Sequence, residues 1–230
     1  SGVAGCLEAR TGAEIWRDLA RRSGRAIVDL DRRGLKTRDI LTDAHHRVKV
    51  AAYDYMTQLC PGEDEHARGY WRDVGTLDAF FETNMDLVSV NPHLNLYNDM
   101  WPIRGVIGGG GPCKFVFADE EDHRVGSAVD SIVGSGTIIS GGQVDRSVVF
   151  NNVRVNSFSR VTESILFPGG SVGRSARLRR CIIDKGVRVP AGAVIGEDPV
   201  ADRERFTVSE GGVVVVTRQD VGQRDEFDVD

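Results

Sequence analysis

One stretch of the chain repeats itself every 17 residues. Between Ile132 and Ile195, three sets of aliphatic residues recur at this interval. The sets are Ile138, Val155, Val172 and Val189; Val144, Val161, Leu178 and Ile195; and Ile132, Val149, Leu166 and Ile183. The stretch is also dense in glycine and proline, which would break any helix. Short strands separated by turns are therefore predicted in its place.

Three short strands in each repeat, each sending one aliphatic side chain inward, describe a triangular coil. Stacking such coils buries a continuous ladder of like residues, so the repeat predicts a parallel β-helix. Small residues follow the same interval at Ser147, Ser164 and Cys181. Arg146, Glu163 and Arg180 are also 17 residues apart. They predict a charge ladder along one outer edge, with a ligand site as the second interpretation.

The bulk composition excludes several classes of protein. A chain of 230 residues that is 40% hydrophobic can bury one large core or two modest ones, and we expect two. A net charge of -5 argues against a nucleic-acid or membrane-surface partner. No apolar run reaches the length of a membrane span, and the start of the chain does not have the pattern of a signal peptide.

The cysteines are widely spaced. Cys6, Cys60, Cys113 and Cys181 show no paired spacing, so neither a zinc site nor a disulfide framework is predicted. Free thiols fit a reducing compartment, so we expect a cytoplasmic location.

Two helices are predicted before the repeat. Residues 11–24 begin with a capping box and continue at helical spacing, and strands are expected at 26–30 and 47–55. A second helix is predicted to start at Thr76 and to present its apolar residues on one face over 77–88.

Asp73 lies just before this second helix, and Trp71 two residues earlier. An acid beside a helix N-terminus suits a metal ion that bridges phosphates, because the carboxylate holds the cation while backbone amides attract the anion. The structural alternative is that Asp73 caps a turn and Trp71 packs in a core.

The glycine run at 108–111 is a candidate phosphate loop, but Phe115 stands where Ser or Thr would hold magnesium. A hinge between two domains is the preferred interpretation. After the coils come a charged stretch at 202–205 and a last strand at 213–216. This strand is expected to cover the open end of the β-helix.

Seven separated motifs support a resemblance to a known family. They lie at residues 69–78, 85–87, 95–98, 101–104, 114–116, 138–142 and 152–157. Together they resemble, in the same order, bacterial glucose-1-phosphate adenylyltransferase, also called ADP-glucose pyrophosphorylase. In that family an α/β nucleotidyltransferase domain precedes a left-handed β-helix.

The resemblance implies a domain division for this chain. Residues 1–104 are expected to be the C-terminal part, or remnant, of the nucleotidyltransferase domain, and residues 105–124 a hinge and connecting strand. Residues 125–218 would form the left-handed parallel β-helix of 17-residue coils. Residues 219–230 are expected to be a disordered tail.

The resemblance also implies an activity. Family members, typically homotetramers, make ADP-glucose and pyrophosphate from ATP and glucose 1-phosphate for glycogen or starch synthesis. Asp73 would be a catalytic residue and one of two aspartates that bind Mg²⁺, and Trp71 would lie with it in the substrate site. The family's glycine-rich nucleotide loop, first metal aspartate and sugar-phosphate lysine are not found in residues 1–50. The chain is therefore expected to be incomplete and inactive alone.

Control by phosphorylated metabolites is a further implication. Lys185 and Arg218 lie in segments that resemble effector-binding segments of some members. Residues 171–190 carry six cations and one acid, which makes a phosphate site plausible in this acidic chain. The alternative is a solvated face that keeps coils from aggregating.

Two other functions stay open at this point. The chain could be a noncatalytic regulatory or assembly subunit that keeps the β-helix and its contacts. It could also be a hexapeptide-repeat acyltransferase, but those enzymes generally need a histidine between coils. All five histidines of this chain precede the repeat, which argues against that chemistry.

Overall fold

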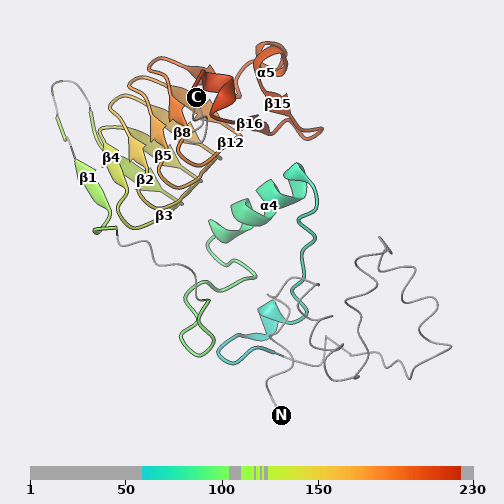
Figure 1. Cartoon of the computed structure of the whole chain (residues 1–230). Helices are drawn as coiled ribbons and strands as arrows, with labels where there is room; N and C mark the ends of the chain where they lie inside the picture. Colours follow the sequence, from blue (N-terminus) through green and yellow to red (C-terminus); the bar gives the residue numbers. More distant parts are fainter. Residues whose placement is uncertain (1–58, 104–109, 117, 120, 122–123, 224–230) are drawn as a thin grey trace, which may run out of the picture. The chain divides into compact units, whose positions relative to one another are not determined.

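The structure is a computed structural model that describes residues 59–103, 110–116, 118–119, 121 and 124–223 (Figure 1). The chain divides into two units, each considered by itself. One contains the residues up to Tyr70 together with 95–103, and the other contains 71–94 and everything from Arg104. The helix predicted at 11–24 and the strands predicted at 26–30 and 47–55 lie outside the described residues.

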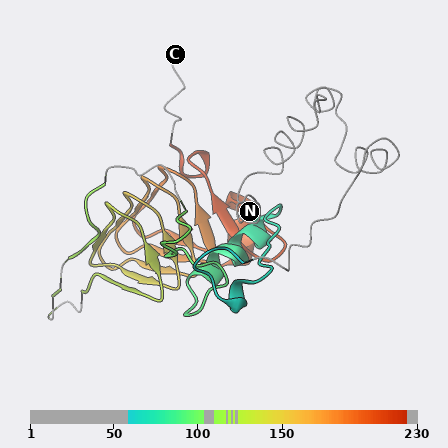
Figure 2. The ribbon, with the colours of Figure 1, turned by 90° about the horizontal axis from the view of Figure 1, so that it is seen from below.

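Successive strands of the second unit stack into three sheets, in the order expected for a β-helix (Figure 1, Figure 2). The first sheet contains β1 (Lys114–Val116), β4 (Ile138–Ser140), β7 (Arg154–Val155), β10 (Ser171–Val172) and β13 (Arg188–Val189). The second contains β2 (Ser127–Val129), β5 (Gln143–Asp145), β8 (Arg160–Thr162), β11 (Arg177–Arg179) and β14 (Val194–Ile195). The third contains β3 (Ile132–Val133), β6 (Val148–Val149), β9 (Ile165–Leu166), β12 (Cys181–Ile183), β16 (Val214–Val216) and β15 (Thr207–Val208). Every pair is parallel except β15 with β16, which confirms the predicted parallel β-helix.

The 17-residue register is confirmed from β5 onward, but the first coil is one residue shorter. Strands β2, β3 and β4 pair with residues 16 positions later. Ile139, rather than Ile138, is therefore the buried partner of Val155. Likewise Val133, rather than Ile132, packs against the core and pairs with Val149. The interval between equivalent residues is therefore 16 in the first coil and 17 in the coils that follow.

A column of small polar side chains links the coils from inside. The hydroxyl of Ser147 accepts a hydrogen bond from the Ser164 N–H at 3.0 Å, and the Ser164 hydroxyl accepts one from the Cys181 N–H at 3.2 Å. Ser147 and Ser164 also donate to carbonyls two residues earlier in their own coils. All three side chains are fully buried. The column spacing thus leaves each buried hydroxyl satisfied as donor and acceptor.

The predicted charge ladder forms over only one step. Arg146, Glu163 and Arg180 occupy equivalent corners, where each adopts a positive φ between 45° and 48°. Arg146 and Glu163 form an ion pair at 3.3 Å. Arg180 instead pairs with Glu82 at 3.4 Å, which lies on a helix far earlier in the sequence.

That helix is α4 (Leu77–Leu87), which begins where the sequence predicts. Thr76 caps it by accepting a hydrogen bond from the Ala79 N–H at 3.1 Å. Its Phe81 side chain is 1% exposed and packs in a second hydrophobic cluster. The other buried members of this cluster are Val148, Ile165, Ile182 and Val213.

These cluster residues lie on the outer face of the third sheet. Alternate residues of a strand point to opposite faces, so Ile165 faces α4 while Leu166 faces the core of the β-helix. The Phe80 and Phe167 rings, which pack against the same cluster, stack with their centroids 6.2 Å apart. In β6, β9 and β12, both members of an adjacent aliphatic pair are therefore buried, one on each face of the sheet.

The C-terminal part contains a helix and a 3-10 turn in addition to the predicted last strand. The charged stretch 202–205 belongs to helix α5 (Pro199–Arg205), whose buried Asp202 accepts a hydrogen bond from the Gly196 N–H at 2.9 Å. The last strand is present as β16. The segment expected to be a tail includes η4 (Gln219–Val221), and residues 224–230 lie outside the described residues. A short η3 (Glu65–Ala67) belongs to the first unit.

The expectation of uniformly free thiols is wrong. Cys60 is disulfide-bonded, whereas Cys113 and Cys181 are free. Burial raises the pKa of the Cys181 thiol to about 12. Within the described residues, no helix has both the length and the apolar character needed to cross a membrane.

The polar column generates a stability prediction. Replacing Ser164 by alanine leaves the buried Cys181 N–H without its acceptor, so the free energy of unfolding should fall by about 1–3 kcal/mol in urea titrations. Ser164→Cys should recover part of this loss, because Cys181 shows that a thiol fits the column. Ser171→Ala, on half-buried strand β10, is the matched control. Equal stabilities of Ser164→Ala and Ser171→Ala would contradict the role of the column.

Candidate functional site

The segment before α4 carries two of the predicted site residues. The Asp73 carboxylate is exposed, and its Oδ1 accepts a hydrogen bond from the Gly75 N–H at 2.9 Å. Asp73 therefore does cap a turn, as the structural alternative proposed. Trp71 does not pack in a core, because 67% of it is exposed. Both side chains are accessible from solvent.

Asp73 fits a magnesium site only as a contributor. Mg²⁺ is usually held by one or two carboxylates together with waters and substrate phosphates, so a single exposed carboxylate is a compatible ligand. No group of three or more His, Cys, Asp and Glu side chains that could hold a metal occurs among the residues that the structure describes.

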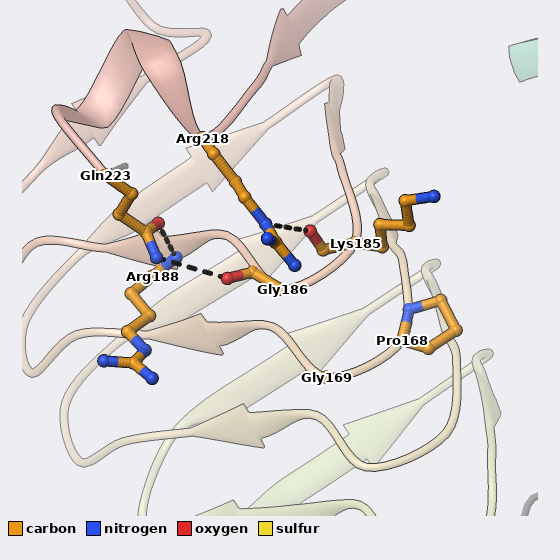
Figure 3. A pocket seen from close by; sticks show the side chains of 7 residues that line it. All are labelled: Pro168, Gly169, Lys185, Gly186, Arg188, Arg218 and Gln223. Carbon is orange, nitrogen blue, oxygen red and sulfur yellow. Dashed lines mark hydrogen bonds between the residues drawn. The ribbon is translucent and has the colours of Figure 1, made fainter. Parts of the chain in front are cut away.

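The other two predicted site residues come together. Lys185 and Arg218 line an open hollow of about 640 Å³ on the β-helix (Figure 3). The remaining lining residues are Pro168, Gly169, Gly186, Arg188 and Gln223. Lys185 follows β12 and Arg218 follows β16, so two adjacent parallel strands deliver the two cations to one place. Their separation of 33 residues in the sequence conceals this proximity.

Gly186 allows Arg218 to lie across the corner of the coil. A Cβ at Gly186 would lie only 2.3 Å from Nη2 of Arg218, and the backbone there has a φ of +67°. Arg218 Nε donates a hydrogen bond to the Lys185 carbonyl at 3.1 Å (Figure 3). Both the steric contact and the positive φ favour glycine at this position.

Gln223 lines one side of the hollow and is not among the residues predicted for the site. Its Oε1 accepts from the Arg188 N–H at 2.6 Å, and its Nε2 donates to the Gly186 carbonyl at 3.3 Å (Figure 3). Both partners are backbone groups, and because every residue carries such groups, the sequence gives no indication of these hydrogen bonds. Gln223 also falls in the segment expected to be a tail, so no sequence signal pointed to it.

Among the residues that the structure describes, the lining of the hollow includes three cations, Lys185, Arg188 and Arg218, and no acid. Several cations of the basic coil are paired elsewhere: Arg177 contacts Glu197 at 3.1 Å, and Arg174 lies 4.6 Å from the centre of the Phe158 ring. In the described part of the chain, no carboxylate forms an ion pair with Lys185, Arg188 or Arg218. Guanidinium and ammonium groups in this arrangement can bind phosphate oxygens through charge-assisted hydrogen bonds.

The stacked coils define the class of protein. A family profile described as "GlmU-like, C-terminal hexapeptide" matches residues 111–216, which agrees with a left-handed β-helix built from hexapeptide repeats.

Comparison with curated proteins gives the particular family. The chain is 45% identical over 181 residues to a glucose-1-phosphate adenylyltransferase of Anaeromyxobacter sp. (strain Fw109-5), which covers 79% of this chain and 44% of that protein. It is 49% identical over 174 residues to the protein of that name from Paramagnetospirillum magneticum, covering 76% of this chain and 39% of the relative. Most of the chain therefore corresponds to the C-terminal part of glucose-1-phosphate adenylyltransferases, which confirms the resemblance. The chain spans less than half the length of these relatives.

A glycine substitution tests the geometry of the hollow. Gly186→Ala should lower the free energy of unfolding by about 1–3 kcal/mol through backbone strain. A further loss should come from the new methyl group, which displaces the Arg218 side chain. Gly192→Ala is the matched control, because Gly192 has a φ of +71° but nothing within 4 Å of its Cβ position. The excess loss in Gly186→Ala should disappear when Arg218 is also changed to alanine. If the two glycine variants are equally stable in urea titrations, Arg218 does not lie on Gly186.

Proposed function

We propose that this chain is part of an enzyme that makes ADP-glucose and pyrophosphate from ATP and glucose 1-phosphate in glycogen biosynthesis. The observation that carries the proposal is the extent of the similarity. The 181 matched residues exceed the hexapeptide segment 111–216, so the similarity continues outside the β-helix. A protein that shared only the β-helix, such as an acyltransferase, would not match there.

In this proposal Asp73 contributes one ligand to the magnesium ion. Mg²⁺, when bound, neutralises the charge that accumulates as the sugar phosphate approaches the α-phosphorus of ATP. The hydrogen bond from Gly75 N–H restrains the Asp73 side chain and leaves it facing solvent. Trp71, two residues away and largely exposed, offers a flat apolar surface in the same substrate site. The exposure of both residues is what substrate binding requires.

The hollow at Lys185 and Arg218 is proposed to bind a phosphorylated metabolite that regulates the enzyme. Its support is the convergence of three cations, with no acid among the described lining residues, on a chain whose net charge is -5. An anion is the ligand that this charge distribution favours. Arg218 is restrained by the Lys185 carbonyl, so less side-chain freedom is lost when it binds.

The assembly and location of the protein are also proposals. A homotetramer in the cytoplasm, with neither nucleic acid nor membrane as a partner, follows from the family resemblance and the acidic charge. The free thiols of Cys113 and Cys181 support the cytoplasmic location, whereas the disulfide of Cys60 does not.

A hybrid enzyme tests the catalytic proposal. The matched residues of this chain would replace the corresponding part of the Anaeromyxobacter relative, and pyrophosphate release from ATP and glucose 1-phosphate with Mg²⁺ would be measured. We expect the hybrid to be active and Asp73→Asn to reduce the rate by about 100-fold, because a metal ligand stabilises the charge of the transition state. The chain alone is expected to release no pyrophosphate.

Asp130→Asn, an exposed acid at a corner of the β-helix, is the matched control. A hybrid that folds as a stable protein but is inactive would favour the alternative, a noncatalytic regulatory or assembly subunit. An active hybrid in which Asp73→Asn and Asp130→Asn have the same rate would remove Asp73 from the catalytic site.

Binding of inorganic phosphate tests the hollow. Lys185→Gln and Arg218→Gln should each weaken phosphate binding by about threefold to tenfold, because each removes a charge-assisted hydrogen bond at an open site. Affinity would be measured by NMR titration at constant ionic strength. Arg203→Gln on α5 makes the same charge change away from the hollow and should leave the affinity unchanged. Equal effects of all three substitutions would mean that phosphate responds only to net charge.

A further inference from the structure

Asp78 ties the start of α4 to a turn near the C-terminus. It is the second residue of the helix, and its Oδ1 accepts a hydrogen bond from the Ser209 hydroxyl. Its Oδ2 accepts a second hydrogen bond from the Gly211 N–H at 3.1 Å. The hydrogen bond from Ser209, and to a smaller extent the one from Gly211, lowers the pKa of Asp78 below its ordinary value. Both oxygens of one carboxylate are therefore used on a single turn 131 or more residues away.

The turn is shaped to receive this carboxylate. The Ser209 hydroxyl that donates to Asp78 also accepts from the Val213 N–H at 2.9 Å, which fixes its direction. A Cβ on Gly211 would lie 2.5 Å from Oδ1 of Asp78, so a side chain there would push the helix away. The close approach thus depends on a glycine and on a pre-oriented hydroxyl.

Arg180 makes a second connection at the same place. Its guanidinium lies 5.0 Å from the centre of the Phe81 ring and contacts Glu82 at 3.4 Å. The same group donates to the Gly211 carbonyl at 3.4 Å. Arg180 therefore binds α4 and the turn together, just before the chain enters β12.

Two paired strands lead from this contact to the hollow. β12 runs from Arg180 toward Lys185, and β16 runs from the turn toward Arg218. They are parallel and in register from Cys181 with Val214 to Ile183 with Val216. At roughly 3.3 Å per residue, the three paired residues of each strand extend about 10 Å, and each cation lies in the turn that follows its strand. One end holds α4, and the other delivers both cations.

We propose that Asp78 is a positioning residue that fixes the Asp73-bearing segment on the β12–β16 ribbon, and that the ribbon couples anion binding in the hollow to that segment. This inference rests on the proposed function, in which Asp73 is a metal ligand and the hollow binds an anion. The segment from Asp73 to Thr76 runs directly into α4, so holding the first turn of the helix restrains it. An anion that binds Lys185 and Arg218 together orders the ends of β12 and β16 that lie at the hollow. Less conformational entropy is then lost when the opposite ends of the two strands bind α4.

Amide hydrogen exchange on the whole chain tests both parts. Without added anion, Asp78→Asn should speed exchange in residues 77–88 and 209–213 together by roughly tenfold. The hydrogen bonds from Ser209 and Gly211 to Asp78 join these two segments, so their local opening is linked. Asp86→Asn, near the other end of α4, is the matched control and should leave 209–213 unchanged. Ser209→Ala, which removes the donor from the opposite side, should reproduce the Asp78→Asn result.

Inorganic phosphate then serves as the probe for coupling. It should slow exchange at 181–188 in the parent chain and in both aspartate variants. It should also slow exchange at 77–88 severalfold in the parent and in Asp86→Asn, but not in Asp78→Asn. Loss of this response while 181–188 stays protected is an effect that mere destabilisation of α4 would not produce.

The other outcomes are distinguishable. Protection at 181–188 without any change at 77–88 in the parent chain overturns the coupling and leaves the hollow as an anion site. An equal response of 77–88 in Asp78→Asn and in the parent overturns the role of Asp78. No protection anywhere overturns the hollow as an anion site, and the coupling falls with it.

Discussion

The structure depends on hydrogen bonds between the backbones of successive coils. The inner strands of the coils pair in parallel with the equivalent strands of the coils before and after them, as Val155 does with Ile139 and Val172. Such pairing continues through a stack only while each coil has nearly the same length and the same three corners. The 17-residue interval, the inward aliphatic columns and the left-handed corner residues all follow from that requirement. The serine column adds hydrogen bonds from inside the coils.

A β-helix of this kind can be covered on an outer face, and this one is covered on its third sheet. The outward residues of that sheet are aliphatic and pack against Phe81. The segment that carries Asp73 is thereby connected to the repeat domain rather than left to itself. In the third sheet β16 pairs with β12, which also brings Arg218 beside Lys185. Packing of the repeat thus determines the surroundings of both candidate sites.

Much of this could be predicted from the sequence, for physical reasons that also explain the errors. The repeat was visible because a buried column accepts only small or aliphatic residues. The shorter first coil was not, because Ile138 and Ile139 are both aliphatic and either register fits. The helix cap at Thr76 is local and was predicted, whereas the contact of Asp78 with Ser209 joins distant residues and was not. Gln223 bonds only to backbone, so its role left no pattern in the sequence.

The central claim is that α4, and with it the Asp73 segment, is held on the outer face of the β-helix. The most direct measurement is a nuclear Overhauser experiment on the 230-residue chain with labelled isoleucine methyl groups. The structure predicts cross-peaks from the Phe81 ring to the methyl groups of Ile165 and Ile182, in addition to those between the two isoleucines of neighbouring coils. Cross-peaks between the isoleucines without any to Phe81 would show a stacked β-helix with a bare third sheet, and would contradict the account.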